Sequence, residues 1–337
     1  GMAQGLFATL IIGTIIQQIG LFMGGGTGDL IYELGKIAAG LTGAGIGVGV
    51  ARKLEAGHLV IVSAAVVGMI GAFAGKILSG QVLVDGNLVL AGPGEPLGAF
   101  AAAYLAIEIG ILISGKTKLD IILTPLVCIG TGSAVGLFVG PPISEFMLWL
   151  GSLINWGTEQ QPFLMGIVVS VLMGMILTLP ISSAALGVIL NLSGLAAGAA
   201  TIGCCCNMIG FAVASWRENK FSGFLAQGIG TSMLQIPNIV RRPLIWLPVI
   251  LSSAVLGPIG TMLLHMTNNA TGSGMGTAGL VGPLMTWQVM TQSEAGVIVL
   301  GKIILIQFIL PAAVTLLISE FMRKKKWIRQ GDMKLEL

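Results

Sequence analysis

Charged residues are scarce in this chain of 337 residues, where they make up 9% of the sequence. A typical soluble domain has about 25%, because a charged surface keeps it dispersed. The 17 basic and 14 acidic residues are too few to cover a soluble domain of this size. The shortage excludes an ordinary cytosolic enzyme, a nucleic-acid-binding protein and a disordered chain, and it predicts that lipid surrounds most of the protein.

Motifs for catalysis and for metal binding are lacking as well. The chain has two histidines, and its sequence contains no H-E-x-x-H or G-x-S-x-G pattern. Its four cysteines are Cys128 and the run 204–206, with no C-x-x-C spacing. Neighbouring helical residues point about 100° apart, so this run cannot converge on one metal ion. We therefore expect no metal, no cofactor and no autonomous catalytic motif.

Long apolar runs are what the sequence has in abundance. Hydrophobic residues make up 55% of the chain, and the mean hydropathy is +0.95. A helix needs about 20 residues to cross the hydrocarbon core of a bilayer. Runs of this length occur at residues 3–24, 31–51, 58–78, 97–115, 119–139, 162–180, 243–265 and 295–320. They predict an all-α polytopic membrane protein with about 8–10 transmembrane helices.

Basic residues cluster between these runs and predict their orientation. The clusters lie at residues 52–53, 116–118, 241–242 and 323–329, and cytoplasmic loops are the ones enriched in Lys and Arg. Both termini are then cytoplasmic, and 79–96 and 140–161 are outer loops. In the first loop, V-L-V-D-G-N-L-V-L (82–90) predicts a β-hairpin. In the second, 143–156 predicts an amphipathic helix at the membrane interface.

Two apolar stretches are too interrupted by Gly, Ser and Pro to be single spans. Residues 181–240 must begin and end inside, as two half-helices or two full spans, and 266–294 must begin and end outside. Non-helical backbone survives at membrane depth only where protein or a water-filled cavity covers it. The two stretches therefore predict re-entrant hairpins around a site. A weak likeness between 118–142 and 242–260 suggests a possible internal repeat.

Neutral polar side chains in these stretches are the candidate substrate ligands. Amides and hydroxyls can pair with the hydroxyls of a sugar without a fixed charge, and Trp287 could stack on a sugar ring. The alternative is that they join helices or lie at the membrane interface. The candidates are Ser182, Ser183, Asn191 and Asn207 in the first hairpin, and Asn268, Asn269, Thr271, Ser273, Thr277, Thr286, Trp287 and Gln288 in the second.

Two ionisable residues are candidates for acid–base catalysis. His265 ends a predicted span beside Asn268, and Glu108 lies in the middle of another, where an unpaired carboxylate is costly. Transfer of a phosphoryl group to a sugar hydroxyl needs a base or an orienting group near that hydroxyl. Each of the two could instead be a hydrogen-bond partner between helices.

Three segments resemble a known family. They are G-F-A-V-A-S-W-R-E-N-K (210–220), G-F-L-A-Q-G-I-G-T-S-M-L-Q-I-P-N (223–238) and N-N-A-T-G-S-G-M-G-T-A-G-L-V-G-P (268–283). Together with the layout of spans, they resemble the membrane subunit IIC of bacterial phosphotransferase-system sugar permeases. The narrower likeness is to the branch that includes perfringolysin regulator-like proteins. A G-I-T-E-type motif, typical of the glucose-like branch, is missing.

The resemblance implies a homodimeric permease in the bacterial inner membrane, surrounded by lipid, with a carbohydrate held between two hairpins. Phosphorylation would come from separate IIA and IIB partners, so that any enzymatic role belongs to the complex. We expect one membrane domain, with scaffold spans at 1–161, a transport half at 162–322 and a cytoplasmic tail at 323–337. The alternatives are a permease-like sensor without turnover and an uncoupled transporter of another small polar solute.

Overall fold

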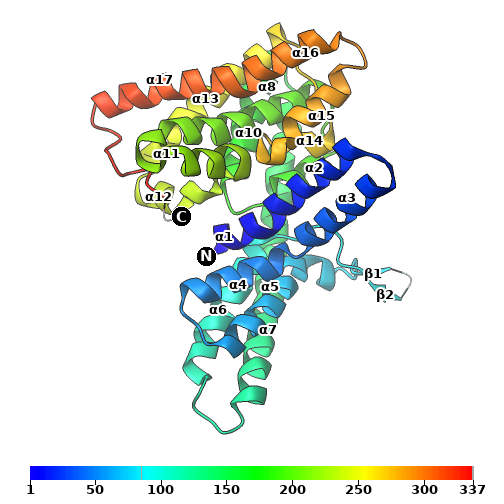
Figure 1. The fold of residues 1–337 in the computed structure, drawn as a ribbon, viewed down its shortest axis with the longest axis vertical. Helices are drawn as coiled ribbons and strands as arrows, with labels where there is room; N and C mark the ends of the chain where they lie inside the picture. The colour runs from blue at the N-terminus through cyan, green and yellow to red at the C-terminus, as the bar shows by residue number, and fades with distance from the viewer. Residues whose placement is uncertain (85, 336–337) are drawn as a thin grey trace. The chain divides into compact units, whose positions relative to one another are not determined.

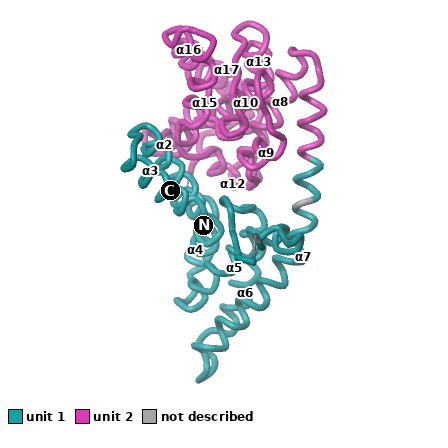
Figure 2. The backbone as a smooth tube through the Cα atoms, turned by 90° about the vertical axis from the view of Figure 1, so that its right-hand side faces the viewer, with its two compact units in different colours: residues 1–149 teal, residues 150–337 magenta. Residues whose placement is uncertain are grey.

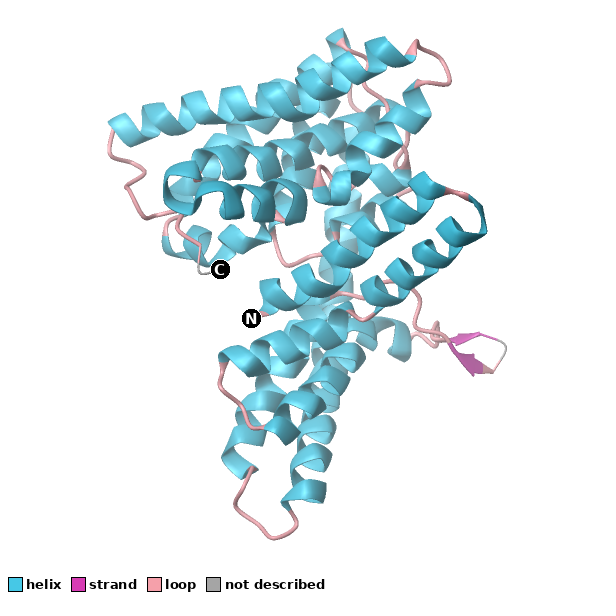
Figure 3. Cartoon of the chain, in the orientation of Figure 1, coloured by secondary structure: helices cyan, strands magenta, loops and turns pink. Residues whose placement is uncertain are grey.

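The computed structural model describes residues 1–84 and 86–335, and nearly all of their regular structure is helical (Figures 1 and 3). The chain forms two compact units, Gly1–Trp149 and Leu150–Leu337 (Figure 2). Seven helices in the described residues are long and apolar enough to cross a membrane, or eight if one bent pair counts as a span. The predicted all-α polytopic membrane architecture is therefore confirmed.

Unit 1 contains a helical hairpin, a three-helix layer and a small sheet. Its elements are α1 (Met2–Leu6), η1 (Phe7–Ile11), α2 (Ile12–Met23), α3 (Gly25–Gly40), α4 (Thr42–Lys53), α5 (His58–Leu78), β1 (Leu83–Val84), β2 (Asn87–Leu88), α6 (Pro96–Ile113) and α7 (Asp120–Thr158). α2 packs along α3, and α5 packs against both α4 and α6. The β1–β2 pair confirms the predicted hairpin, of which Asp85 lies outside the described residues.

Small residues bring the helices of unit 1 close together. The backbone of Gly20 on α2 lies against Gly28 on α3, and that of Gly43 on α4 lies against Gly68 on α5. In lipid, helix association depends on such close backbone contact, because burial of apolar side chains gives little driving force there. The many glycines of the sequence are used in this way.

The predicted span 31–51 is broken near its middle. Helices α3 and α4 are bent by 50° at a break at Leu41, whose φ of −85° and ψ of 13° leave the helical range. The hydroxyl of Thr42 donates to the carbonyl of Ala39 at 2.6 Å. This side-chain bond competes with the backbone ladder and gives the chain an alternative to a continuous helix.

The helix predicted at 143–156 is present, but it is not separate from the preceding span, so the predicted loop at 140–161 is wrong. A single helix, α7, runs through this region from Asp120 to Thr158 and contains Pro125, Pro141 and Pro142. A proline removes its own backbone donor and usually bends or breaks a helix, yet α7 continues past all three. The division between the two units falls within this helix.

Unit 2 is built around one buried helix. Its elements are α8 (Pro162–Thr178), α9 (Ser183–Ile189), α10 (Gly194–Ala214), α11 (Trp216–Leu225), η2 (Ala226–Gly230), η3 (Ser232–Gln235), α12 (Ile236–Arg241), η4 (Pro243–Trp246), α13 (Leu247–Pro258), η5 (Ile259–Leu263), α14 (Ala270–Ser273), η6 (Ala278–Leu280), α15 (Val281–Met290), α16 (Gly296–Ile303), η7 (Ile304–Ile309) and α17 (Leu310–Lys324). α8, α13 and α17 all pack against α10, which is buried along most of its length.

Candidate functional site

Helix α10 is the element on which the candidate site is built. Its sequence is dominated by Gly, Ala and Cys, so neighbouring backbones approach it closely. Gly203 lies against the backbone carbonyl of Ser170 on α8, and Gly198 lies against that of Met266. These contacts bring the neighbouring helices close to α10 and leave no room for larger side chains. The few polar groups on α10 are therefore surrounded by protein.

Breaks in three helical segments meet beside α10. The hydroxyl of Thr178, at the end of α8, lies 2.8 Å from that of Ser232 in η3. The hydroxyl of Thr277, between α14 and η6, donates to the carbonyl of Gly228 in η2 at 2.5 Å. All four residues belong to chain segments where the α-helix ends or gives way to a 3₁₀- or π-helical turn. Non-helical backbone is thus gathered in the interior of the unit, where protein covers it.

Asn207 is the centre of the first polar cluster. Its side-chain amide donates to the carbonyl of Gly203 at 3.1 Å and to the hydroxyl of Ser253 at 3.4 Å. Its oxygen accepts from Thr178 at 3.1 Å and from the indole of Trp246 at 3.2 Å. Asn207 is fully buried. We call Asn207, Thr178, Ser232, Trp246 and Ser253 the Asn207 cluster; they come from α10, α8, η3, η4 and α13.

Asn268 is the centre of a second polar cluster. Its amide donates to the hydroxyls of Thr201 at 2.8 Å and Thr286 at 3.0 Å, and Gln307 donates to the same Thr286 hydroxyl at 2.9 Å. The four residues are buried, and we call them the Asn268 cluster. The side-chain oxygen of Gln307 is buried with no hydrogen-bond partner in the described part of the chain.

The two predicted hairpins contact each other directly. The hydroxyl of Ser183 on α9 donates to the carbonyl of Gly274 at 2.6 Å, and the backbone of Asn268 donates to the carbonyl of Gly194 at 3.2 Å. Ser182 caps α9 by accepting from the backbone of Ala185. Residues 181–214 and 266–290, which belong to the two stretches predicted to form hairpins, are therefore packed together inside unit 2.

Several predicted ligands lie elsewhere or have local partners. Asn191, Thr271 and Gln288 are exposed, and Trp287 is 39% exposed. Asn269 and Ser273 bond within α14: the side chain of Asn269 caps the helix at the backbone of Gly272, and the hydroxyl of Ser273 donates to Ala270. These six positions remain predictions as substrate ligands, and none is part of the two clusters.

Neither of the two candidate acid–base residues is a member of the clusters. His265 is exposed and has a φ of +48° in the turn before Met266. Glu108 lies on α6 of unit 1, half-buried, with a hydrogen bond from the hydroxyl of Tyr104. Among the described residues, neither takes part in the hydrogen bonds of Asn207 or Asn268, and their roles remain predictions.

Sequence reasoning missed several members of the clusters, namely Thr178, Thr201, Ser232, Trp246, Ser253 and Gln307. A signal existed for Gln307, since it is the one amide in the apolar run 295–320 and polar groups at membrane depth need a reason. It also lies in η7, a π-helical segment, and such segments are frequent at functional sites. No group of three or more His, Cys, Asp or Glu side chains in 1–84 and 86–335 could hold a metal ion.

The chain can now be compared with known proteins. No curated protein matches it. The sequence model of one family, described as "Phosphotransferase system, EIIC", matches residues 1–335. The narrower likeness to perfringolysin regulator-like proteins remains a prediction. Since the match spans nearly the whole sequence, the chain belongs to the EIIC family and is a membrane permease subunit of a sugar phosphotransferase system.

Proposed function

We propose that the Asn207 and Asn268 clusters line the sugar-binding site of this permease. The observation that carries the proposal is the meeting of three broken segments beside α10, at Thr178–Ser232 and at Thr277–Gly228. Substrate sites of membrane transporters are commonly formed by such discontinuous helices. Buried amides and hydroxyls without a charged group suit a neutral, polyhydroxylated substrate.

The hydrogen bonds between segments suggest how binding and opening are linked. In this structure each amide hydrogen-bonds protein groups, so a sugar must replace some of those bonds. The bonds between Thr178 and Ser232 and between Thr277 and Gly228 join separate segments, and they can exchange for sugar hydroxyls at little net cost. The described structure then corresponds to a closed state, and sugar binding favours the open one.

Partners and membrane placement complete the proposal. A soluble IIB protein is the phosphodonor of an EIIC permease, and a carbohydrate is its substrate. We place the chain in the bacterial plasma membrane with both termini in the cytoplasm, because the basic clusters at 52–53, 241–242 and 323–329 then lie inside. A homodimer surrounded by lipid remains our proposal from the resemblance, as do Glu108 and His265 as groups that orient the reacting hydroxyl.

Replacing Gln307 by leucine is expected to reduce sugar affinity at least tenfold with little change in thermal stability. Leucine of similar size removes a buried oxygen that has no partner, which offsets the loss of the bond from the Gln307 amide to Thr286, whose hydroxyl still accepts from Asn268. The same change removes an acceptor that a sugar hydroxyl would use. Affinity by calorimetry and the unfolding midpoint, measured on one preparation, separate the two effects. Unchanged affinity would show that Gln307 does not contact the sugar.

The proposed function is tested with purified protein and a panel of sugars. Thermal stabilisation in detergent should single out one sugar class, and liposomes should take up that sugar only with phosphoenolpyruvate and the soluble phosphotransferase proteins. Binding without uptake would indicate a sensor instead. Uptake that needs neither phosphoenolpyruvate nor an ion gradient would indicate an uncoupled transporter.

A further inference from the structure

The segment after α17 folds back onto α11 and α12 and is held there by three amide side chains. Asn219 donates to the carbonyl of Met333 at 2.8 Å and accepts from the backbone of Leu335 at 2.8 Å. Gln235 donates to the same Met333 carbonyl at 3.0 Å, and Asn238 donates to that of Lys334 at 2.9 Å. Residues 326–335 therefore have a fixed path over the end of the unit.

This path completes a strongly basic pocket. The pocket has a volume of about 410 Å³ and is lined by Arg217, Arg323, Lys326, Ile328, Arg329 and Gln330. Ile328 is buried and anchors the segment that carries Lys326 and Arg329. Four of the six lining side chains are cationic, and the other two are neutral.

Only two of the four cationic side chains pair with a carboxylate. Arg217 pairs with Glu320 at 3.0 Å, and Arg323 pairs with Glu218 at 2.9 Å. No ion pair involves Lys326 or Arg329 in the part of the chain that the structure describes. The pocket therefore retains a positive charge that an anion would neutralise.

Arg323 supplies a second, independent observation. Its side chain is 9% exposed, and its terminal nitrogen serves Glu218 and the carbonyl of Ala214. The Nε atom is buried and has no hydrogen-bond partner among the described residues. An unsatisfied buried donor is costly and calls for an explanation such as an ion that belongs there. Arginine is also the side chain best suited to bind phosphate.

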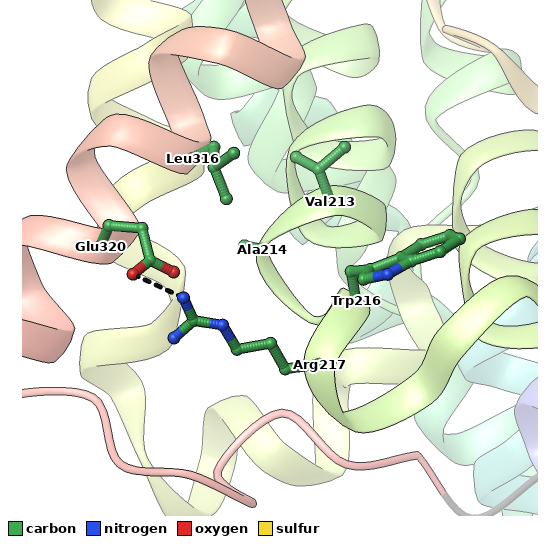
Figure 4. A pocket seen from close by; sticks show the side chains of 6 residues that line it. All are labelled: Val213, Ala214, Trp216, Arg217, Leu316 and Glu320. Atoms are coloured by element: carbon green, nitrogen blue, oxygen red, sulfur yellow. Dashed lines mark hydrogen bonds and ion pairs between the residues drawn. The ribbon is translucent and has the colours of Figure 1, made fainter.

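An apolar pocket adjoins the basic one and shares Arg217 with it. Figure 4 shows Val213, Leu316 and Trp216 around this space, with the Arg217–Glu320 pair at its side. Its volume is about 440 Å³. A basic pocket beside an apolar one fits a ligand that has a phosphate at one end and hydrocarbon at the other.

We propose that the basic pocket is a binding site for a phosphate group, with Lys326 and Arg329 as its donors and the buried guanidinium of Arg323 beside them. Two sources share this chemistry, an anionic phospholipid headgroup and a soluble phosphate. The apolar pocket makes the headgroup the expected source, and basic pockets on the cytoplasmic side of helix bundles recognise such lipids. The site goes beyond the proposed sugar function and does not depend on it.

The test compares two double variants of equal charge. K326Q/R329Q removes the two unpaired cations of the pocket, whereas K324Q/K325Q removes two exposed cations that precede them and do not line it. All four positions are exposed, so both proteins should fold. One arm titrates inorganic phosphate into protein in neutral detergent by calorimetry. The other counts phosphatidylglycerol retained from mixed nanodiscs by native mass spectrometry, with phosphatidylcholine as the reference.

Whichever ligand the unmodified protein binds, phosphate or phosphatidylglycerol, we expect K326Q/R329Q to weaken that binding at least tenfold. The affinity of K324Q/K325Q should stay within about twofold of that of the unmodified protein. Preferential phosphatidylglycerol retention supports the headgroup as the source, and saturable phosphate binding alone supports a soluble one. No saturable binding in either arm would overturn the proposal. Equal losses in the two variants would also overturn it, because they would reduce the effect to general surface charge.

Discussion

Replacing Asn207 by alanine is expected to abolish sugar uptake and to lower the free energy of unfolding by about 1–3 kcal/mol. The side chain is fully buried, and its loss leaves the indole of Trp246 without its acceptor, whereas the hydroxyls of Thr178 and Ser253 keep other partners. Each buried polar group left unsatisfied costs about 1–3 kcal/mol. The binding loss follows because Asn207 joins α8, α10 and α13 at the proposed sugar site.

The matched control is Asn155→Ala. Asn155 is the same residue type in unit 2, but it is exposed on α7 and is not a candidate ligand, so its substitution should leave uptake within about twofold of the unmodified protein. Uptake is measured in liposomes at equal reconstituted protein, and sugar affinity is measured well below the unfolding midpoint of each variant. Normal uptake by the Asn207 variant, or an equal loss in the Asn155 variant, would contradict the proposed site.

The position of the spans could be predicted from the sequence because a bilayer fixes their length and polarity. Runs such as 58–78 and 162–180 differ from the helices α5 and α8 by two residues at most. The bend at Leu41 and the continuous helix α7 could not be predicted in this way, since hydropathy carries no information on where the backbone ladder breaks.

The candidate site was predicted only in part, for a physical reason. Asn207 and Asn268 are conspicuous because amides in apolar stretches are costly, whereas Thr201 and Ser253 are common residues of membrane helices. A helix that faces lipid and a helix that is buried in protein are rich in the same apolar residues. The sequence therefore could not show that α10 is the central helix of unit 2. The hydrogen bond from Asn219 to the carbonyl of Met333 joins residues 114 positions apart, and no local sequence pattern predicts such a contact.

Substituting Gly203 by alanine is expected to destabilise unit 2 by about 3 kcal/mol or more, as overpacking against backbone does. A Cβ at this position would meet the backbone carbonyl of Ser170 on α8, and backbone cannot move aside as a flexible side chain can. The apparent unfolding midpoint in detergent should fall by roughly 10 °C. Gly301→Ala is the control in the same unit, because a Cβ there meets nothing within 4 Å.

The Gly203 substitution should also reduce sugar affinity, although its side chain would not touch the sugar. Pushing α8 from α10 separates Thr178 from Asn207, whose 3.1 Å bond joins the end of α8 to the first cluster. Gly301→Ala, which replaces a flexible residue within a helix, should be neutral or slightly stabilising and leave affinity unchanged. If the Gly203 variant were as stable as the Gly301 variant and bound sugar equally well, the close packing of α8 on α10 would not be what holds the site together.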